Sequence, residues 1–278
     1  MTRLLTLLSA ATLIVCPAVG ADPSSFPRSV DAQSLGRGGT VIAGLPGAWS
    51  VFGNPATLTP AGFSLLGLDY VDQRDTSESS WSLSVVDTKS AIRGALSYFK
   101  DPEFAGFKNK MWGVSFSQTL MPSLYLGESF HMGDYEPDSD PGGEESLRSV
   151  DAGLLYMLGP KVSVGYVARN LFPSDKDLLE QYNGFGIGLQ LPWTIYFAAD
   201  YEEDPVLGGE NNLRAGVEFN PVKKIVGRVG YQDLAEGDTY LTLGITYKDI
   251  NGTLDAAVLY NDKTDRTDRI ALGLSIQM

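Results

Sequence analysis

Nine charged side chains occur in short segments where apolar residues alternate with small or polar ones, and all nine fall on the polar phase. Because successive side chains of a strand point to opposite faces, these nine are expected on one face of a sheet. Charges that line a pore select permeating ions, whereas charges of opposite sign that meet neutralise each other. We favour mutual neutralisation. The nine are Asp69, Arg93, Asp151, Arg169, Arg214, Glu218, Arg228, Asp255 and Arg269.

A serine and the single histidine of the sequence point to a second kind of chemistry, acyl transfer. Ser129 and His131 lie two residues apart and share one face of a strand. A catalytic pair needs hydrogen-bond contact and a third group that orients the imidazole, but Cα atoms two residues apart on a strand are separated by about 7 Å. No G-x-S-x-G motif accompanies the pair. We therefore predict no catalytic residues and no enzyme.

An acidic segment, residues 134–145, carries six carboxylates in twelve residues. Hard cations such as Ca²⁺ bind several oxygen ligands at spacings of this sort. The segment does not closely follow the twelve-residue calcium-loop pattern, and a run of like charge is ordinarily a solvated loop. We interpret it as such a loop and predict neither a metal site nor a cofactor.

The last ten residues show most clearly which elements carry these side chains. Apolar residues at every second position alternate there with small or polar ones: Ile270, Leu272, Leu274, Ile276 and Met278. A strand with this pattern has one face suited to lipid and one suited to a wet lumen, and about ten residues are enough to cross an outer membrane. The pattern is typical of a transmembrane β-barrel.

About fourteen segments of this kind follow one another from Phe63 to Met278, and the connections between them are alternately long and short. That alternation is typical of outer-membrane barrels, in which short turns face the periplasm and longer loops face outward. We predict an all-β antiparallel barrel of 14 strands, with 12 as the alternative. The strands are expected near 63–71, 80–86, 90–100, 108–120, 123–132, 146–158, 161–171, 183–190, 193–202, 211–219, 223–232, 239–248, 253–260 and 267–278.

Aromatic residues gather toward the ends of these segments, where amphipathic rings favour the two membrane–water interfaces. They are Tyr70, Trp81, Tyr98, Trp112, Tyr156, Tyr166, Trp193, Tyr231, Tyr247 and Tyr260. Individually each is an ordinary sheet aromatic. Their shared position favours two aromatic girdles.

The N-terminus predicts export. Arg3, an apolar run from Leu4 to Val15 and small residues ending at Ala21 make up a cleavable signal peptide, residues 1–21. The one cysteine, Cys16, lies inside it, so the exported chain is expected to contain no disulfide. The net charge of −13 argues against nucleic-acid binding. We predict the outer membrane of a Gram-negative bacterium as the location, with phospholipid and lipopolysaccharide as the surroundings.

Residues 22–62 do not alternate and are rich in Gly, Ala, Ser and Pro. They contain the stretch Leu35-Gly36-Arg37-Gly38-Gly39 and, just before the first strand, the box Asn54-Pro55-Ala56. This combination resembles the start of the FadL family of outer-membrane transporters and of the related PorV/PorQ group. Glycines let a backbone pack closely in a narrow space, Asn54 can cap a turn, and Pro55 fixes the direction in which the chain leaves it.

The resemblance implies a 14-stranded barrel, residues 63–278, whose N-terminal segment 22–62 folds into the lumen as a hatch. It also implies a channel that carries small hydrophobic molecules, fatty acids among them, inward past the two motifs. The outer loops of about six to thirteen residues are too short to form the apolar capture groove of the well-known fatty-acid transporters. Two alternatives therefore stay open: a non-transporting partner or scaffold of a secretion or surface complex, as the PorV/PorQ resemblance allows, and a soluble periplasmic sheet protein.

Overall fold

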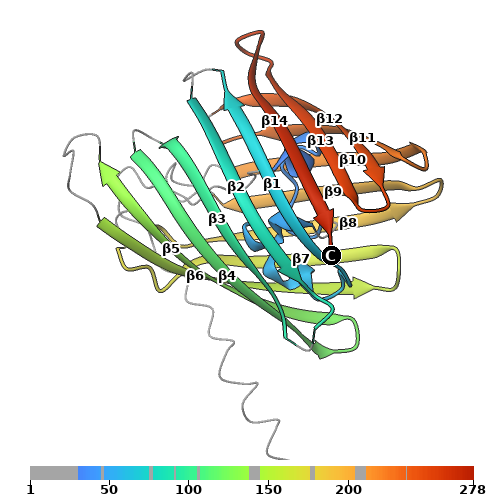
Figure 1. The fold of residues 1–278 in the computed structure, drawn as a ribbon, viewed down its shortest axis with the longest axis horizontal. Helices are drawn as coiled ribbons and strands as arrows, with labels where there is room; N and C mark the ends of the chain where they lie inside the picture. Colours follow the sequence, from blue (N-terminus) through green and yellow to red (C-terminus); the bar gives the residue numbers. More distant parts are fainter. Residues whose placement is uncertain are drawn as a thin grey trace, which may run out of the picture.

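A computed structural model describes residues 31–44, 47–74, 78–90, 92–104, 107–137, 145–175, 179–203, 211–235 and 237–278. Within these residues, fourteen antiparallel strands form one closed barrel, in which every strand pairs with its sequence neighbours and β1 pairs with β14 (Figure 1). The predicted fold class is confirmed, with 14 strands rather than 12. The predicted signal peptide and residues 138–144 of the acidic segment lie outside the described residues.

The strands have the following bounds: β1 Ser64–Gln73, β2 Glu78–Asp87, β3 Arg93–Phe104, β4 Phe107–Met121, β5 Leu124–Pro137, β6 Glu145–Leu158, β7 Val162–Leu171, β8 Tyr182–Leu191, β9 Ile195–Glu203, β10 Asn211–Val222, β11 Ile225–Asp233, β12 Thr239–Asp249, β13 Gly252–Asn261 and β14 Arg266–Gln277. No helix in the described part of the chain is long and apolar enough to cross a membrane.

Strands β3 and β5 run further toward the loop end than the sequence predicts. The predicted loops 101–107 and 133–145 are wrong in part, because Asp101 pairs with Asn109 and Asp134 pairs with both Lys110 and Ser146. Backbone hydrogen bonds continue there after the apolar alternation has stopped, since the peptide groups still gain by pairing. The wall is therefore taller around β3 to β6 (Figure 1).

The outward face of the wall is apolar and wide enough for lipid. On β14, for example, the outward residues Leu272 and Leu274 are 54% and 42% exposed, while the preceding residue, Ala271, faces inward and is buried. Near the loop end the outward rings of Trp81, Tyr98 and Trp112 stack side by side, with centroids 4.9 and 4.6 Å apart. An apolar belt edged by aromatic rings is the surface of a membrane-spanning barrel.

Both ends of the barrel wall lie at the short-turn end. The Met278 amide donates to the Ser64 carbonyl at 2.9 Å, and the Lys89 ammonium donates to the Met278 carbonyl at 2.7 Å. This closure follows from the even strand number. In an outer membrane the short-turn end faces the periplasm.

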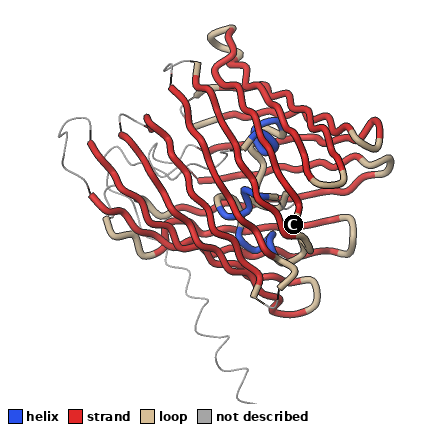
Figure 2. The backbone as a smooth tube through the Cα atoms, in the orientation of Figure 1, coloured by secondary structure: helices blue, strands red, loops and turns tan. Residues whose placement is uncertain are grey.

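The described residues before β1, 31–44 and 47–62, lie inside the barrel (Figures 1 and 2). We call residues 31–62 the inner segment. It contains one short helix, α1 (Ala32–Gly36), and two 3₁₀ turns, η1 (Ala48–Val51) and η2 (Pro55–Leu58). Helix α1 contacts β1 and β11 to β14, η1 contacts β1 to β4, and η2 contacts β4 to β6. The apolar core lies between this segment and the wall, where Val51, Phe52 and Leu58 pack with Val86, Phe99 and Met111.

Candidate functional site

The helix of the inner segment starts at a capped turn and is held by its apolar side. Asp31 is the N-cap, and its carboxylate accepts a hydrogen bond from the Ser34 amide at 2.8 Å. Leu35 packs with Val71, Leu259 and other buried residues of β1, β13 and β14. Residues that are distant in sequence therefore place the glycine-rich stretch against the wall.

The glycines of this stretch are required by the closeness of the wall. A Cβ on Gly36 would lie 2.8 Å from the Cα of Gly244 on β12, nearer than real Cβ atoms come to a backbone atom. Gly38 has φ +66° and donates its amide hydrogen to Thr242 Oγ1 at 3.0 Å. Gly39 also has a positive φ, of +72°. Backbone therefore meets backbone here, and any side chain would push the segment inward.

Arg37 joins the inner segment to a line of charges on the wall. Its guanidinium is almost fully buried, with Nη1 3.5 Å from Glu218 Oε2 and Nε 3.1 Å from the Thr40 hydroxyl. Glu218 accepts a second bond from Arg228 Nε at 2.9 Å, and Arg228 Nη1 lies 3.7 Å from Asp255. Burial of charges is costly unless they are paired, so this line both neutralises the lumen charges and fixes the segment.

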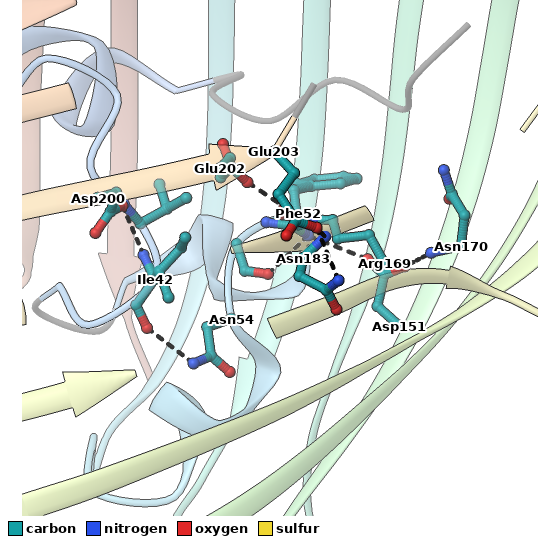
Figure 3. A network of polar contacts seen from close by, with 12 residues as sticks. Ile42, Phe52, Asn54, Asp151, Arg169, Asn170, Asn183, Asp200, Glu202 and Glu203 are labelled. Carbon is teal, nitrogen blue, oxygen red and sulfur yellow. Dashed lines mark hydrogen bonds and ion pairs between the residues drawn. The ribbon is translucent and has the colours of Figure 1, made fainter. Parts of the chain in front are cut away.

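A second network connects residues of β6, β7 and β9 to the inner segment (Figure 3). Arg169 Nη1 donates to the carbonyls of Phe52 and Gly53, at 3.0 Å each, and to Asp151 Oδ2 at 3.1 Å. Asp151 also meets His131 Nε2 at 3.2 Å. The cavity that these groups line is about 10 Å³, which leaves room for about one water.

The network continues to a carboxylate pair on β9. Glu202 contacts both Arg169 and Arg214, and Asp200 accepts the amide hydrogens of Val41 and Ile42 at 2.5 and 2.9 Å. Both carboxylates are buried, and neither is among the nine charges predicted for the lumen. The sequence did contain a signal for this position. Asp200 and Glu202 are spaced two residues apart, so they lie on the same face of the strand as Ala198, which points inward.

Asn54 ties the end of the inner segment to the wall. The side chain is fully buried, and its Nδ2 donates to the carbonyls of Ile42 at 2.8 Å and Leu154 at 3.0 Å. Its Oδ1 accepts the Ala56 amide at 3.0 Å, which starts η2 with Pro55 in its first position. Gly153 lies directly opposite, so that a Cβ there would collide with the Asn54 side-chain oxygen.

Most of the predicted lumen charges face inward and are buried. Seven of the nine are less than a tenth exposed, namely Asp69, Asp151, Arg169, Arg214, Glu218, Arg228 and Asp255. Arg93 and Arg269 are half-buried. Arg93 lies at the short-turn edge, where its Nη1 is 3.4 Å from the Thr119 hydroxyl. The wall thus brings together seven of these charges, and two stay at its margins.

Ser129 and His131 do not form a catalytic arrangement with each other. The Ser129 hydroxyl lies 2.6 Å from that of Ser115 and 3.3 Å from the Val51 carbonyl, while the His131 ring faces Asp151. Both residues contribute to the contact between wall and inner segment.

Burial changes the acidity of the helix cap. The pKa of the Asp31 carboxyl is raised to about 6 by burial, an effect that its hydrogen bonds to Ser34 and the charge of Arg37 partly oppose. The negative charge of Asp255 raises the pKa of Asp31 further, by a smaller amount. The cap therefore changes its charge between pH 5 and 7.

No protein-family model matches this chain, and no curated protein sequence matches it. Solved structures do match its fold. The toluene transporter TodX of Pseudomonas putida superposes with a TM-score of 0.67 at 14% identity, covering 90% of this chain and 98% of TodX. The deltaS2 mutant of TodX, a monoaromatic hydrocarbon channel, matches with a TM-score of 0.65 at 14% identity, over 89% of this chain and 98% of the mutant. The outer membrane protein Omp33 of Acinetobacter baumannii matches with a TM-score of 0.53 at 12% identity, over 78% of this chain and 98% of Omp33.

The two kinds of match differ in how much of the chain they cover. Residues 63–278 are 216 of the 278 residues, or about 78% of the chain. The barrel wall alone is enough to account for the match to Omp33. A match over 90% of the chain must include residues that precede β1. The likeness to TodX therefore extends into the N-terminal part of the chain. The fold is that of a TodX-type transmembrane barrel.

Proposed function

We propose that this chain is an outer-membrane channel that passes small hydrophobic molecules, with single-ring aromatic hydrocarbons as the first substrate class to test. The observation that carries the proposal is the fold likeness to TodX, which reaches beyond the barrel wall into the N-terminal part. The apolar outward belt supports a membrane location, and the short-turn end is assigned to the periplasm. Residues 1–21 are assigned as the signal peptide that exports the chain.

In this proposal residues 22–62 are the hatch and residues 63–278 the transport barrel. The transport path passes the two sequence motifs, Leu35 to Gly39 and Asn54 to Ala56. This path is supported by the position of both motifs against inward-facing wall residues, Gly244 for the first and Gly153 for the second. A hydrocarbon that crosses the lumen must displace at least one of these contacts. Movement of the inner segment is therefore part of the transport step.

The test is to lock the inner segment to the wall and measure uptake. A Cβ built on Gly273 of β14 lies 3.4 Å from the Cβ of Ala32 in α1, close to the separation found across disulfides, and the Asp69 side-chain oxygen must turn aside to admit it. The double variant Ala32→Cys/Gly273→Cys can therefore be oxidised, and the sequence has no other cysteine after Cys16. Uptake of labelled toluene by a Gram-negative host should fall on oxidation and return with a membrane-permeant reductant.

Two controls make this result specific. The single variant Ala32→Cys should be unaffected by the oxidant, and uptake of a small polar solute should not respond to the lock. A host that takes up toluene equally with and without the wild-type protein would contradict the transport function. Uptake that persists through the oxidised pair would contradict a moving hatch.

A second candidate is a non-transporting partner protein of the outer membrane, bound to other proteins within a secretion or surface complex. The close packing favours it: the inner segment meets the wall backbone to backbone at Gly36 and also at Gly127, which faces Pro55 and Ala56. Purification in mild detergent separates the two candidates. A fixed co-eluting protein, together with no hydrocarbon uptake, supports the partner role.

A further inference from the structure

An apolar groove of about 540 Å³ crosses the outward face of the barrel next to the seam between β14 and β1. Its outer edge is a row of cross-strand neighbours formed by Ile245, Ala256, Leu272 and Tyr70 on β12, β13, β14 and β1. Three strand spacings of about 4.8 Å make this row about 14 Å long. The small side chain of Ala256 lies between two larger exposed ones, Ile245 and Leu272, which leaves a gap in this row.

The inner edge of the groove is the next row toward the short turns. It consists of Tyr247, Leu254, Leu274 and Leu68, again one residue from each strand. The groove is thus bounded by two parallel rows of apolar side chains. Its length and volume suit one extended hydrocarbon chain, and the volume lies in the range of about 300–1,000 Å³ found for small-molecule pockets.

A basic turn lies at the short-turn end of the groove. Ile225 lines the groove, and the two residues before it are the exposed lysines Lys223 and Lys224 of the turn between β10 and β11. The Lys224 ammonium is 5.6 Å from the centre of the Tyr247 ring and 3.4 Å from its hydroxyl. It also contacts Asp249 at 2.9 Å. Two cations and one carboxylate leave a net positive charge at this point.

The charge of the whole short-turn end agrees with this local excess. The residues between strands at that end include four lysines and no Asp or Glu: Lys89, Lys161, Lys223 and Lys224. The connections at the opposite end contain far more acidic than basic residues. Phospholipid phosphates lie at the level of the short turns, and lysines at that level attract them.

The geometry points to a binding site for one anionic phospholipid of the periplasmic leaflet. One acyl chain lies in the groove over Ala256, and the phosphate lies against Lys223 and Lys224, where the Tyr247 hydroxyl can also donate to it. Asp249 disfavours a second negative group but does not cancel both lysines, so a headgroup with one net negative charge fits best. The inference depends on the membrane location and not on transport.

The experiment is native mass spectrometry of the full chain in detergent, with phosphatidylglycerol or phosphatidylethanolamine added. The wild type should retain one phosphatidylglycerol in preference to phosphatidylethanolamine by about tenfold. Ala256→Phe fills the groove and should lose the bound lipid. Lys223→Gln/Lys224→Gln should retain both lipids equally, because the acyl contact stays while the charge is lost.

Matched controls keep the result from reflecting a general change in the barrel. Ala199→Phe enlarges another outward alanine, on β9, and Lys161→Gln removes a lysine from a different short turn; both should behave as the wild type. Equal retention of the two lipids by the wild type, or an Ala256→Phe variant that retains phosphatidylglycerol, overturns the site. So does a dimer of the chain that Ala256→Phe disrupts, because the occupant would then be a second copy.

Discussion

Arg169 on β7 holds the carbonyl of Gly53 at 3.0 Å, across the gap between the barrel wall and the inner segment. The same Nη1 atom also binds Phe52 and Asp151. One buried side chain thus connects the backbone of the segment to the charge network of the lumen.

Arg169→Met should loosen the inner segment and destabilise the protein. The methionine fills part of the space but leaves Asp151 without its guanidinium, and breaking a buried pair in this way costs about 3–5 kcal/mol. Unfolding by denaturant in lipid vesicles measures the change. Arg74→Met is the matched control, because its pair with Asp72 is exposed on both sides and is worth at most about 1 kcal/mol. Equal losses in the two variants would refute the anchoring role of Arg169.

Gly153→Ala should displace the Asn54 turn. The added Cβ would collide with the Asn54 side-chain oxygen and come within 3.1 Å of Pro55 Cδ, so the segment must shift at a cost of about 1–3 kcal/mol. Limited proteolysis should then cut the chain faster between residues 50 and 62. Gly227→Ala is the control, since the nearest atoms there belong to the movable, outward ring of Phe219. Unchanged cleavage of Gly153→Ala would show that the turn tolerates the shift.

Glu128→Leu should stabilise the barrel. Glu128 is exposed on the outward face of β5, in register between Phe116 and Ala152, where it meets lipid. Basic residues facing lipid at mid-membrane cost about 2–4 kcal/mol and acidic ones less, so a gain of about 1 kcal/mol is expected. Denaturant unfolding in vesicles measures it. A loss of stability would mean that Glu128 makes a contact that stabilises the barrel by more than exposure of its carboxylate to lipid destabilises it.

The inner segment should be held more tightly at low pH. Because the pKa of Asp31 rises from 3.8 to about 6 on folding, its protonated form is favoured in the folded state. That contribution is fully present below about pH 4 and is lost as the pH rises through 6. In Asp31→Asn the amide oxygen still caps α1, so the free energy of unfolding should vary less between pH 4 and 7. Asp72→Asn, at a more exposed carboxylate, should keep the wild-type slope.

The alternation of residues was enough to predict the wall, because lipid on one side and the packed lumen on the other impose a period of two. The prediction of strand ends failed where the two faces of a strand no longer differ in polarity. Beyond Lys100 on β3 and Met132 on β5 the apolar alternation stops, and backbone pairing extends the strands. Asp200 and Glu202 fall inside the predicted strand 193–202, but they stand at its end in an acidic run, 200 to 204, where the inward charges do not differ from their polar neighbours.

The lumen charges were predictable as a set, but their partners were not. Whether Arg169 meets Asp151 or another carboxylate depends on the register of β6 against β7, which no local pattern specifies. Arg37 was predicted as a site residue because it lies in the glycine-rich stretch. Its contact with Glu218 depends on the path of the inner segment across the lumen, and a sequence without a repeat does not determine that path.

The contact of α1 with β13 and β14 also has a consequence for assembly. The ribosome makes α1 before any strand of the wall, yet the strands on which it rests are the last to be made. The wall surface on which α1 rests is therefore complete only once β13 and β14 are in place. A chain that lacks β13 and β14 loses the surface that holds α1 as well as two strands of the wall, so that addition of these strands and placement of α1 become a single event.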